Sequence, residues 1–154
     1  MRLEHLCDVE FAFDAPPALV RPYGTEEGAA FGQGGGTVSG ERLRGTARWV
    51  NHPHRRSDGV MYPDMDGIIT TESGSTILFS MQGRTIWQQT TRGPAGNQLL
   101  RVLFDAEDPH YRWLNGAVCV MEGRVSPPPP PGQPAIVHHT DPARIYVCLN
   151  DLMD

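Results

Sequence analysis

The sequence predicts an all-β protein, a single antiparallel β-barrel of about eight strands with little helix. Glycine and proline together supply 31 of the 154 residues, 17 and 14 respectively, which favours a chain rich in turns. Short runs of alternating apolar and polar residues lie between these turn residues, as is typical of half-buried strands. The length fits one domain, and we expect it to span residues 1–154.

The first predicted strand covers residues 3–13. Its alternate positions are expected to share one buried face: Leu3, His5, Cys7, Val9, Phe11 and Phe13. Prolines and glycines break residues 15–36, which indicates a connecting loop. A second strand is expected over residues 37–50, interrupted near Gly40 and Gly45.

The remaining strands are separated by turn signals, including Asp58-Gly59, a pair that commonly closes a hairpin. We expect these strands at residues 61–71, 75–82, 85–91, 97–104, 117–125 and 145–149, with turns at 72–74 and 83–84. Residues 109–115 are the one helical candidate, a single short turn. Residues 126–135 are a predicted proline-rich surface loop, because the five prolines at 127–131 cannot join a sheet ladder.

Composition excludes several classes of function. The formal net charge is −5, so the basic surface that a nucleic-acid partner requires is missing. All 13 basic residues are arginine, which excludes lysine Schiff-base and lysine general-base chemistry. No apolar run is long enough for a membrane span, and residues 1–10 do not resemble a signal peptide. Cys7, Cys119 and Cys148 form no CxxC pair; we expect buried free thiols and a cytoplasmic location.

The densest cluster of reactive side chains lies at residues 48–67. On a strand, Tyr62, Asp64 and Asp66 point the same way, with the two carboxylates ~6–7 Å apart. If this face lines a low-dielectric barrel, one carboxyl keeps a raised pKa and serves as a general acid or base. The alternative is a pair of solvated aspartates beside Arg55 and Arg56.

Two histidines, His52 and His54, precede Asp58, an arrangement similar to the metal motif of cupin barrels. The match is partial, because Asp replaces the usual Glu and no second motif supplies the last histidine. We therefore predict no metal and no other cofactor, and keep a metal-dependent cupin-like enzyme as an alternative. Otherwise the two histidines lie in a loop near the cavity mouth, where either one assists proton transfer.

Aromatic and polar side chains near the predicted strands suit a cavity for a flat ligand. The candidate substrate-binding residues are Arg44, Arg48, Trp49, Tyr62, Trp87, Tyr111, Trp113 and Asn115. Arg44 or Arg48 would receive an anionic oxygen. Plain core filling is the alternative for each aromatic residue, and capping of a turn is the alternative for Asn115.

Residues 35–45 resemble the opening signature of a family of small bacterial proteins catalogued only as a domain of unknown function. The likeness continues through residues 3–6, Trp49, Asp58-Gly59, the strand-opening Asp64, the Tyr-x-Trp-Leu-Asn segment at 111–115 and the closing strand at 145–149. This resemblance implies an antiparallel barrel similar to allene oxide cyclases and dirigent proteins. Those relatives steer the cyclisation of hydrophobic intermediates with few or no cofactors.

Two residues depart from the pattern of that family. Asp66 stands where an arginine is usual, and Gly67 where an aromatic residue is common. The exchange of arginine for aspartate inverts a charge in the expected cavity. It points to a substrate or a chemistry different from those of the other family members.

These observations predict a cofactor-independent isomerase, cyclase or lyase of catabolism or secondary metabolism. It would act on a hydrophobic or aromatic small molecule in the barrel cavity, with Asp64 and Asp66 transferring protons. The alternatives are a non-catalytic small-molecule-binding barrel, the metal-dependent enzyme built on His52 and His54, and a scaffold recognised through its prolines. The predicted partner is a small-molecule substrate, with no nucleic acid and no membrane, and the composition fits a monomer or a homo-oligomer.

Overall fold

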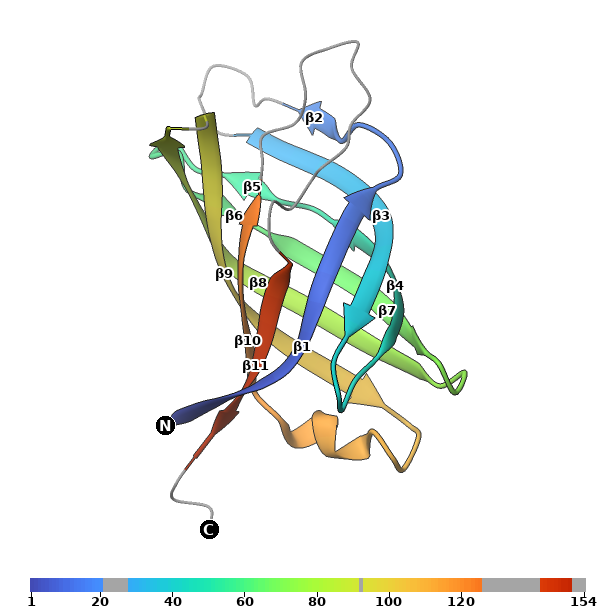
Figure 1. The fold of residues 1–154 in the computed structure, drawn as a ribbon. Coiled ribbons are helices and arrows are strands. Elements are labelled where there is room, and N and C mark those ends of the chain that lie inside the picture. Colours follow the sequence, from blue (N-terminus) through green and yellow to red (C-terminus); the bar gives the residue numbers. More distant parts are fainter. Residues whose placement is uncertain (21–27, 92, 126–141, 151–154) are drawn as a thin grey trace.

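The computed structural model describes residues 1–154 except 21–27, 92, 126–141 and 151–154, so the predicted loop at 126–135 lies outside the described residues. In the described part, eleven strands form one antiparallel sheet (Figure 1). They are β1 (Arg2–Phe13), β2 (Ala18–Val20), β3 (Gly28–Ser39), β4 (Gly45–Asn51), β5 (His54–Arg55), β6 (Met61–Tyr62), β7 (Asp64–Thr71), β8 (Thr76–Thr90), β9 (Gly93–Ala106), β10 (Cys119–Val125) and β11 (Ala143–Leu149). One short 3-10 helix, η1 (Arg112–Gly116), completes the described elements and confirms the all-β prediction.

The sheet closes into a barrel. Its ring runs β1, β3, β4, β7, β8, β9, β10 and β11, and β11 pairs back with β1. The closed antiparallel ring confirms the predicted barrel of about eight strands, and it leaves these strands without open edges. The short strands β2, β5 and β6 lie at one end, here called the upper end, and η1 lies across the lower end (Figure 1).

The core fills the inside of the barrel. Alternate residues of each strand point inward, as the burial of Ile77, Phe79 and Met81 on β8 illustrates. On the neighbouring β9, Leu100 and Val102 are also buried. Apolar side chains therefore occupy most of the interior.

Two glycine-rich segments were predicted as a loop and a turn, and both predictions are wrong. Residues 28–36, expected to belong to a loop, form most of β3, and residues 83–84, expected to be a turn, lie inside the continuous β8. A Cβ atom at Gly83 would lie 2.2 Å from the Leu99 carbonyl oxygen. Glycine therefore serves here for close backbone approach between paired strands rather than for a change of chain direction.

The start of β1 also departs from its predicted pattern. Leu3 and His5 are exposed, whereas Leu6 and Cys7 are both buried. The register against β11 shifts between His5 and Cys7, which marks a β-bulge. The extra residue changes the phase of alternation, so the single buried face expected over residues 3–13 begins only at Cys7.

The predicted strand at residues 61–71 is two strands, β6 and β7, separated by Pro63. Proline has no N–H to donate, which interrupts the ladder at this position. β7 begins at the next residue, Asp64, whose backbone N–H donates to Asn51 Oδ1 at 3.1 Å. This hydrogen bond joins the start of β7 to the end of β4 at the upper end of the barrel.

The lower end is closed by η1 at residues 112–116, which overlaps the short helical turn expected at residues 109–115. Leu114, within η1, is fully buried, and Tyr111, which directly precedes the helix, is also buried. Asn115 fixes the helix to β9, since its Oδ1 accepts from the Ala106 N–H at 2.7 Å and its Nδ2 donates to the Ala106 carbonyl at 3.0 Å. Within the described ranges, no helix has the length and apolar character needed to cross a membrane.

Candidate functional site

The two aspartates of β7 face away from the barrel interior, so the expectation that they line it is wrong. Asp64 and Asp66 are exposed, whereas Met65 and Ile69 at the alternate positions are buried. Because side chains alternate along a strand, burial of these two apolar residues sends both carboxylates to the outer face. The low-dielectric surroundings expected for proton transfer are therefore absent at both residues.

Asp64 belongs to a polar network on the outer face of the barrel. Its Oδ1 accepts a hydrogen bond from Gln82 Nε2 at 2.7 Å. Gln82 Oε1 in turn accepts from Arg101 Nη2 at 3.0 Å. The network crosses β7, β8 and β9 in exposed surroundings, where such contacts contribute little to stability.

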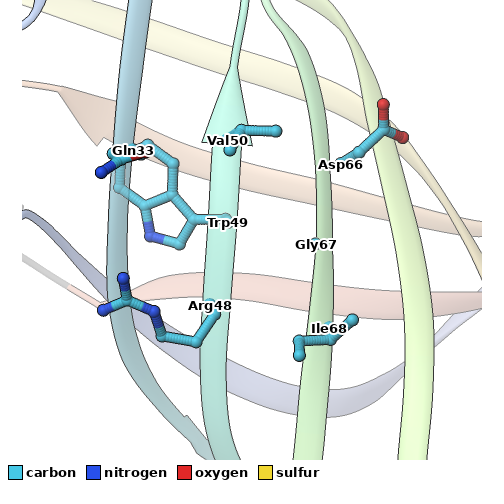
Figure 2. Close-up of a pocket in the computed structure, with 7 residues that line it drawn as sticks. All are labelled: Gln33, Arg48, Trp49, Val50, Asp66, Gly67 and Ile68. Atoms are coloured by element: carbon cyan, nitrogen blue, oxygen red, sulfur yellow. The ribbon is translucent and has the colours of Figure 1, made fainter.

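Asp66 lines an open outer groove of about 420 Å³ across β3, β4 and β7 (Figure 2). Its lining residues are Gln33, Arg48, Trp49, Val50, Asp66, Gly67 and Ile68. Figure 2 shows the Arg48 guanidinium lying over β3 and the Asp66 carboxylate on the opposite side of the groove. Arg48 also makes two hydrogen bonds to Asp14, at 2.8 and 3.3 Å, which balance its charge.

The arginines predicted to receive an anionic oxygen do not reach the interior. Arg48 lies on the outer face, and Arg44 is exposed in the connection between β3 and β4 at the lower end. Neither lines the internal cavity described below. Both side chains are exposed, and that of Arg48 is paired with Asp14.

The two histidines lie at the upper end and are exposed. The His52 ring lies 4.8 Å from that of Phe31 in an edge-on contact, and His54 belongs to β5. Among the residues that the structure describes, no three His, Cys, Asp or Glu side chains come close enough to hold a metal ion. The set His52, His54 and Asp58 is therefore not assembled as a metal site.

The predicted substrate-binding residues other than the arginines are divided between the two ends of the barrel. Tyr111, Trp113 and Asn115 belong to the closed lower end, where the Arg42 guanidinium lies 3.9 Å from the Trp113 ring. Tyr62 lies at the upper end on β6 and contacts Arg84, whose guanidinium is 4.0 Å from its ring. The structure does not bring these residues together around one ligand.

Trp87 also lies towards the upper end, on β8, where its Nε1 donates to the sulfur of Met61 at 3.1 Å. Among the predicted substrate-binding residues, Trp49 alone lines the internal cavity described by the structure. Its side chain is only 4% exposed.

That cavity has a volume of about 50 Å³ and lies inside the upper half of the barrel. Its lining residues are Val9, Phe11, Phe13, Trp49, Asn51, Met65, Gln98, Met121, Val125 and Ala143. Three aromatic rings form one wall: Trp49 lies 4.8 Å from Phe13 and 5.8 Å from Phe11. Met65 and Met121 are flexible side chains that allow such a cavity to enlarge around a guest. The described lining therefore suits a small apolar molecule, and a guest as large as a benzene ring requires these methionines to move, because the cavity as it stands has only about 50 Å³.

Inward-facing glycines of β3 make room for this aromatic wall. A Cβ atom at Gly32 would lie 2.3 Å from the Phe13 ring, and one at Gly34 would lie 2.8 Å from the Trp49 ring. At Gly36 it would lie 2.8 Å from the Phe11 ring. The three rings thus lie directly against the backbone of β3.

Two carboxamides, Asn51 and Gln98, are the polar side chains among the described residues that line the cavity. Neither was predicted from the sequence. A signal was present for Gln98, because it shares its strand parity with Leu100 and Val102, which are both buried. A polar residue on the buried face of a strand needs a partner, which makes it a candidate binding residue.

Two of the three thiols are buried and unreactive in the folded protein. Burial raises the pKa of Cys7 to about 12 and that of Cys119 to about 11. Both remain neutral at physiological pH, so neither supplies a nucleophilic thiolate. The expectation of buried thiols is confirmed for these two, whereas Cys148 is partly exposed.

The fold and the internal cavity together define an antiparallel β-barrel protein with a small, largely apolar interior site. Residues 1–133 match the family described as protein of unknown function DUF3237. The chain belongs to this family, which confirms the expected membership of an uncharacterised barrel family. A search of curated proteins found no match.

Several solved structures share the fold. A β-barrel-like protein from Acinetobacter baumannii is 18% identical with a TM-score of 0.75, covering 95% of this chain and 94% of its own. A protein of unknown function from Clostridium acetobutylicum is 16% identical with a TM-score of 0.78, covering 97% and 100%. A protein described as an enzyme from Penicillium herquei is 20% identical with a TM-score of 0.60, covering 96% and 97%. At these identities the likeness extends to the fold alone.

Proposed function

We propose that this barrel binds a small, largely apolar organic molecule in its upper internal cavity. The observation that carries the proposal is the combination of an aromatic wall with two carboxamides in a barrel whose lower end is closed. Apolar surfaces with a few placed polar groups are the usual composition of small-molecule sites. The non-catalytic binding barrel, an alternative from the sequence, therefore becomes the leading function.

The cavity lining also supports binding over carboxylate-driven proton transfer. Its described lining residues include no Asp, Glu, His, Lys or Arg side chain. Asp64 and Asp66 lie on the outer face, and His52 and His54 on the exposed upper end. A general acid or base needs hydrogen-bond contact with the reacting atom, which these residues do not have inside the cavity.

Filling the cavity should abolish binding. Ala143 is 1% exposed and lines the cavity, so Ala143→Leu places extra carbon atoms in the space left for a ligand. We expect toluene, titrated against ¹⁵N-labelled protein by NMR, to bind the native chain and to bind Ala143→Leu at least about tenfold more weakly, a difference of about 1.4 kcal/mol.

The matched control is Ala12→Leu, which adds the same atoms on the outer face of β1. It should leave toluene affinity unchanged. Thermal unfolding of each variant reports whether the barrel is intact, and Val125→Phe supplies a second filled cavity if Ala143→Leu does not fold. Absence of toluene binding to the native chain, or equal affinity in the filled and native proteins, would exclude this cavity as the site.

A second candidate is conversion of the bound molecule by isomerisation, cyclisation or elimination without a cofactor. A structural neighbour described as an enzyme favours it. It is also what the resemblance of the sequence to allene oxide cyclases and dirigent proteins implies. Polarisation of a bound carbonyl by the Asn51 amide would assist such a reaction.

The cytoplasm remains the proposed location, since its reducing conditions keep free cysteines reduced.

Turnover is tested on organic molecules that co-purify with the chain, identified by native mass spectrometry. Each is incubated with a hundredth of its concentration of protein, and the products are separated by chromatography. Conversion beyond one equivalent that falls in Asn51→Leu supports catalysis. Recovery of unchanged compound would exclude turnover of that molecule and leave binding as the one proposed function.

A further inference from the structure

Resting on the proposed function, we infer that the cavity selects an uncharged molecule carrying a hydrogen-bond acceptor and a hydrogen-bond donor. A carboxamide, or a carbonyl compound bearing a hydroxyl group, has this chemistry. The inference comes from the hydrogen bonds that Asn51 and Gln98 already make, because these bonds decide which atoms of each amide remain for a ligand.

Asn51 offers a donor. Its Oδ1 accepts the hydrogen bond from the Asp64 backbone N–H at 3.1 Å. A backbone N–H can only donate, so this contact fixes which end of the amide carries the oxygen. The Nδ2 group, with two N–H donors, has no partner among the described residues and suits a ligand carbonyl.

Gln98 offers an acceptor. Its Nε2 donates to Thr85 Oγ1 at 3.0 Å, and Thr85 is itself only 2% exposed. In this orientation of the amide, the Oε1 atom has no partner among the described residues and suits a ligand hydroxyl or N–H. In the described part of the chain, no side-chain nitrogen or oxygen is both buried and without a hydrogen bond. The two remaining amide atoms are therefore accessible.

The two amides reach the cavity from different sides of the ring. Asn51 ends β4 and Gln98 lies on β9, with β7 and β8 between these strands in the barrel. A ligand must therefore carry its acceptor and its donor on different atoms to satisfy both.

The remaining lining argues against a charged ligand. Apart from the two amides, the described residues that line the cavity are apolar or aromatic. A carboxylate placed there would lose its hydration without an arginine or lysine partner, which is far costlier than burying a neutral amide. Ligand discrimination is thus expected between molecules of equal shape that differ only in charge.

Four compounds with one benzene ring separate these features. Toluene has neither polar group, acetophenone has an acceptor, benzamide has an acceptor and a donor, and benzoate is charged. Their affinities are measured by NMR titration for the native chain, Asn51→Leu and Gln98→Met, with thermal unfolding to establish that each variant is folded.

We expect Asn51→Leu to weaken acetophenone and benzamide about tenfold and Gln98→Met to weaken benzamide alone about tenfold, because each removes one hydrogen bond to the ligand. Thermal unfolding shows the separate effect of losing the Asp64 or Thr85 contact within the protein. Toluene should bind both variants at least as tightly as the native chain, because each substitution removes an amide that toluene leaves without a hydrogen bond. Benzoate should bind the native chain at least about tenfold more weakly than benzamide.

If toluene binds the native chain but both variants keep native affinity for benzamide, the donor and acceptor assignment is wrong while the binding function stands. Selection for an uncharged ligand is likewise wrong if benzoate binds the native chain as tightly as benzamide does. If none of the four compounds binds the native chain, the proposed function itself is overturned.

Discussion

At the scale of single residues, the glycines of β3 determine which side chains fit the upper interior. The structure places Phe13 against Gly32, and the absent Cβ leaves space for the ring. Glycine at such a position has a steric role, although it is unfavourable in a strand on conformational grounds. The aromatic wall of the cavity therefore depends on residues that have no side chains.

This pairing predicts a compensating double substitution. Gly32→Ala should destabilise the protein by about 1–3 kcal/mol, because the new methyl group lies 2.3 Å from the Phe13 ring. Adding Phe13→Leu to Gly32→Ala should recover part of that loss. Urea unfolding of the two single variants and the double variant measures the coupling energy. Additive effects, with no recovery in the double variant, would contradict the steric explanation.

The alternation of side chains along β7 explains why Asp64 and Asp66 were expected inside the barrel and lie outside it. The sequence establishes that Asp64 and Asp66 share a face of a strand, and the structure agrees. Period-two alternation alone does not say which face is inside. Met65 and Ile69 on the opposite face carry the apolar surface, and their burial decides the orientation of β7.

At the scale of elements, η1 is held across the lower end of the barrel by the side chain of Asn115, which bonds to the backbone of Ala106. Asn115 makes two hydrogen bonds to the backbone of Ala106, and the helix holds Leu114 in the interior. The Tyr-x-Trp-Leu-Asn segment was predicted to bind substrate. Its position indicates a structural role, in which the asparagine connects β9 to the helix.

Loss of this connection should destabilise the protein. Asn115→Ala leaves the Ala106 N–H and carbonyl without their side-chain partners, at an expected cost of about 1–3 kcal/mol in the free energy of unfolding. Asn97→Ala is the control, since Asn97 is exposed and its side chain bonds to the exposed Gln88 side chain. Chemical denaturation of both variants checks the difference. Equal stability of the two would show that the Asn115 contacts are dispensable.

Most strands could be predicted from alternation, and the failures share a cause. The predicted strand at 97–104 lies inside β9, and that at 145–149 lies inside β11. The loop at 28–36 and the turn at 83–84 failed because glycine marks both turns and close strand contacts. The cavity residues Asn51 and Gln98 were missed because their importance arises from ring closure, which brings β4 and β9 to one space.

At the scale of the whole molecule, the closed ring isolates Cys7 and Cys119 from water. Both thiols are fully buried, and their raised pKa values mean that the folded state retains protons that an unfolded chain releases. Because the chain has no lysine and arginine stays charged at alkaline pH, no basic side chain changes its charge there. Thiols and tyrosines remain as the groups that titrate there.

Stability should therefore fall as pH rises above about 9. The unfolded thiols lose their protons near this pH, while Cys7 keeps its own up to about 12. Each buried thiol then lowers the free energy of unfolding by up to about 1.4 kcal/mol per pH unit. Urea unfolding at pH 8 and pH 10.5 measures the slope, which should be shallower in Cys7→Ala. An identical slope in that variant would assign the alkaline loss to other groups.

The glycines of β3 also constrain how the family can diverge. At Gly34 and Gly36 the nearest obstacle is the backbone of β1, with the Ala12 and Glu10 carbonyl oxygens at 1.9 and 2.0 Å from a Cβ. No exchange elsewhere would relieve those contacts, so these two positions should be invariant among relatives with this strand pairing. At Gly32 only the Phe13 ring intervenes. Positions 13 and 32 should therefore covary among relatives. Because Phe13 lines the cavity, each paired exchange would change the shape of the cavity and, under the proposed binding function, the ligand that fits it.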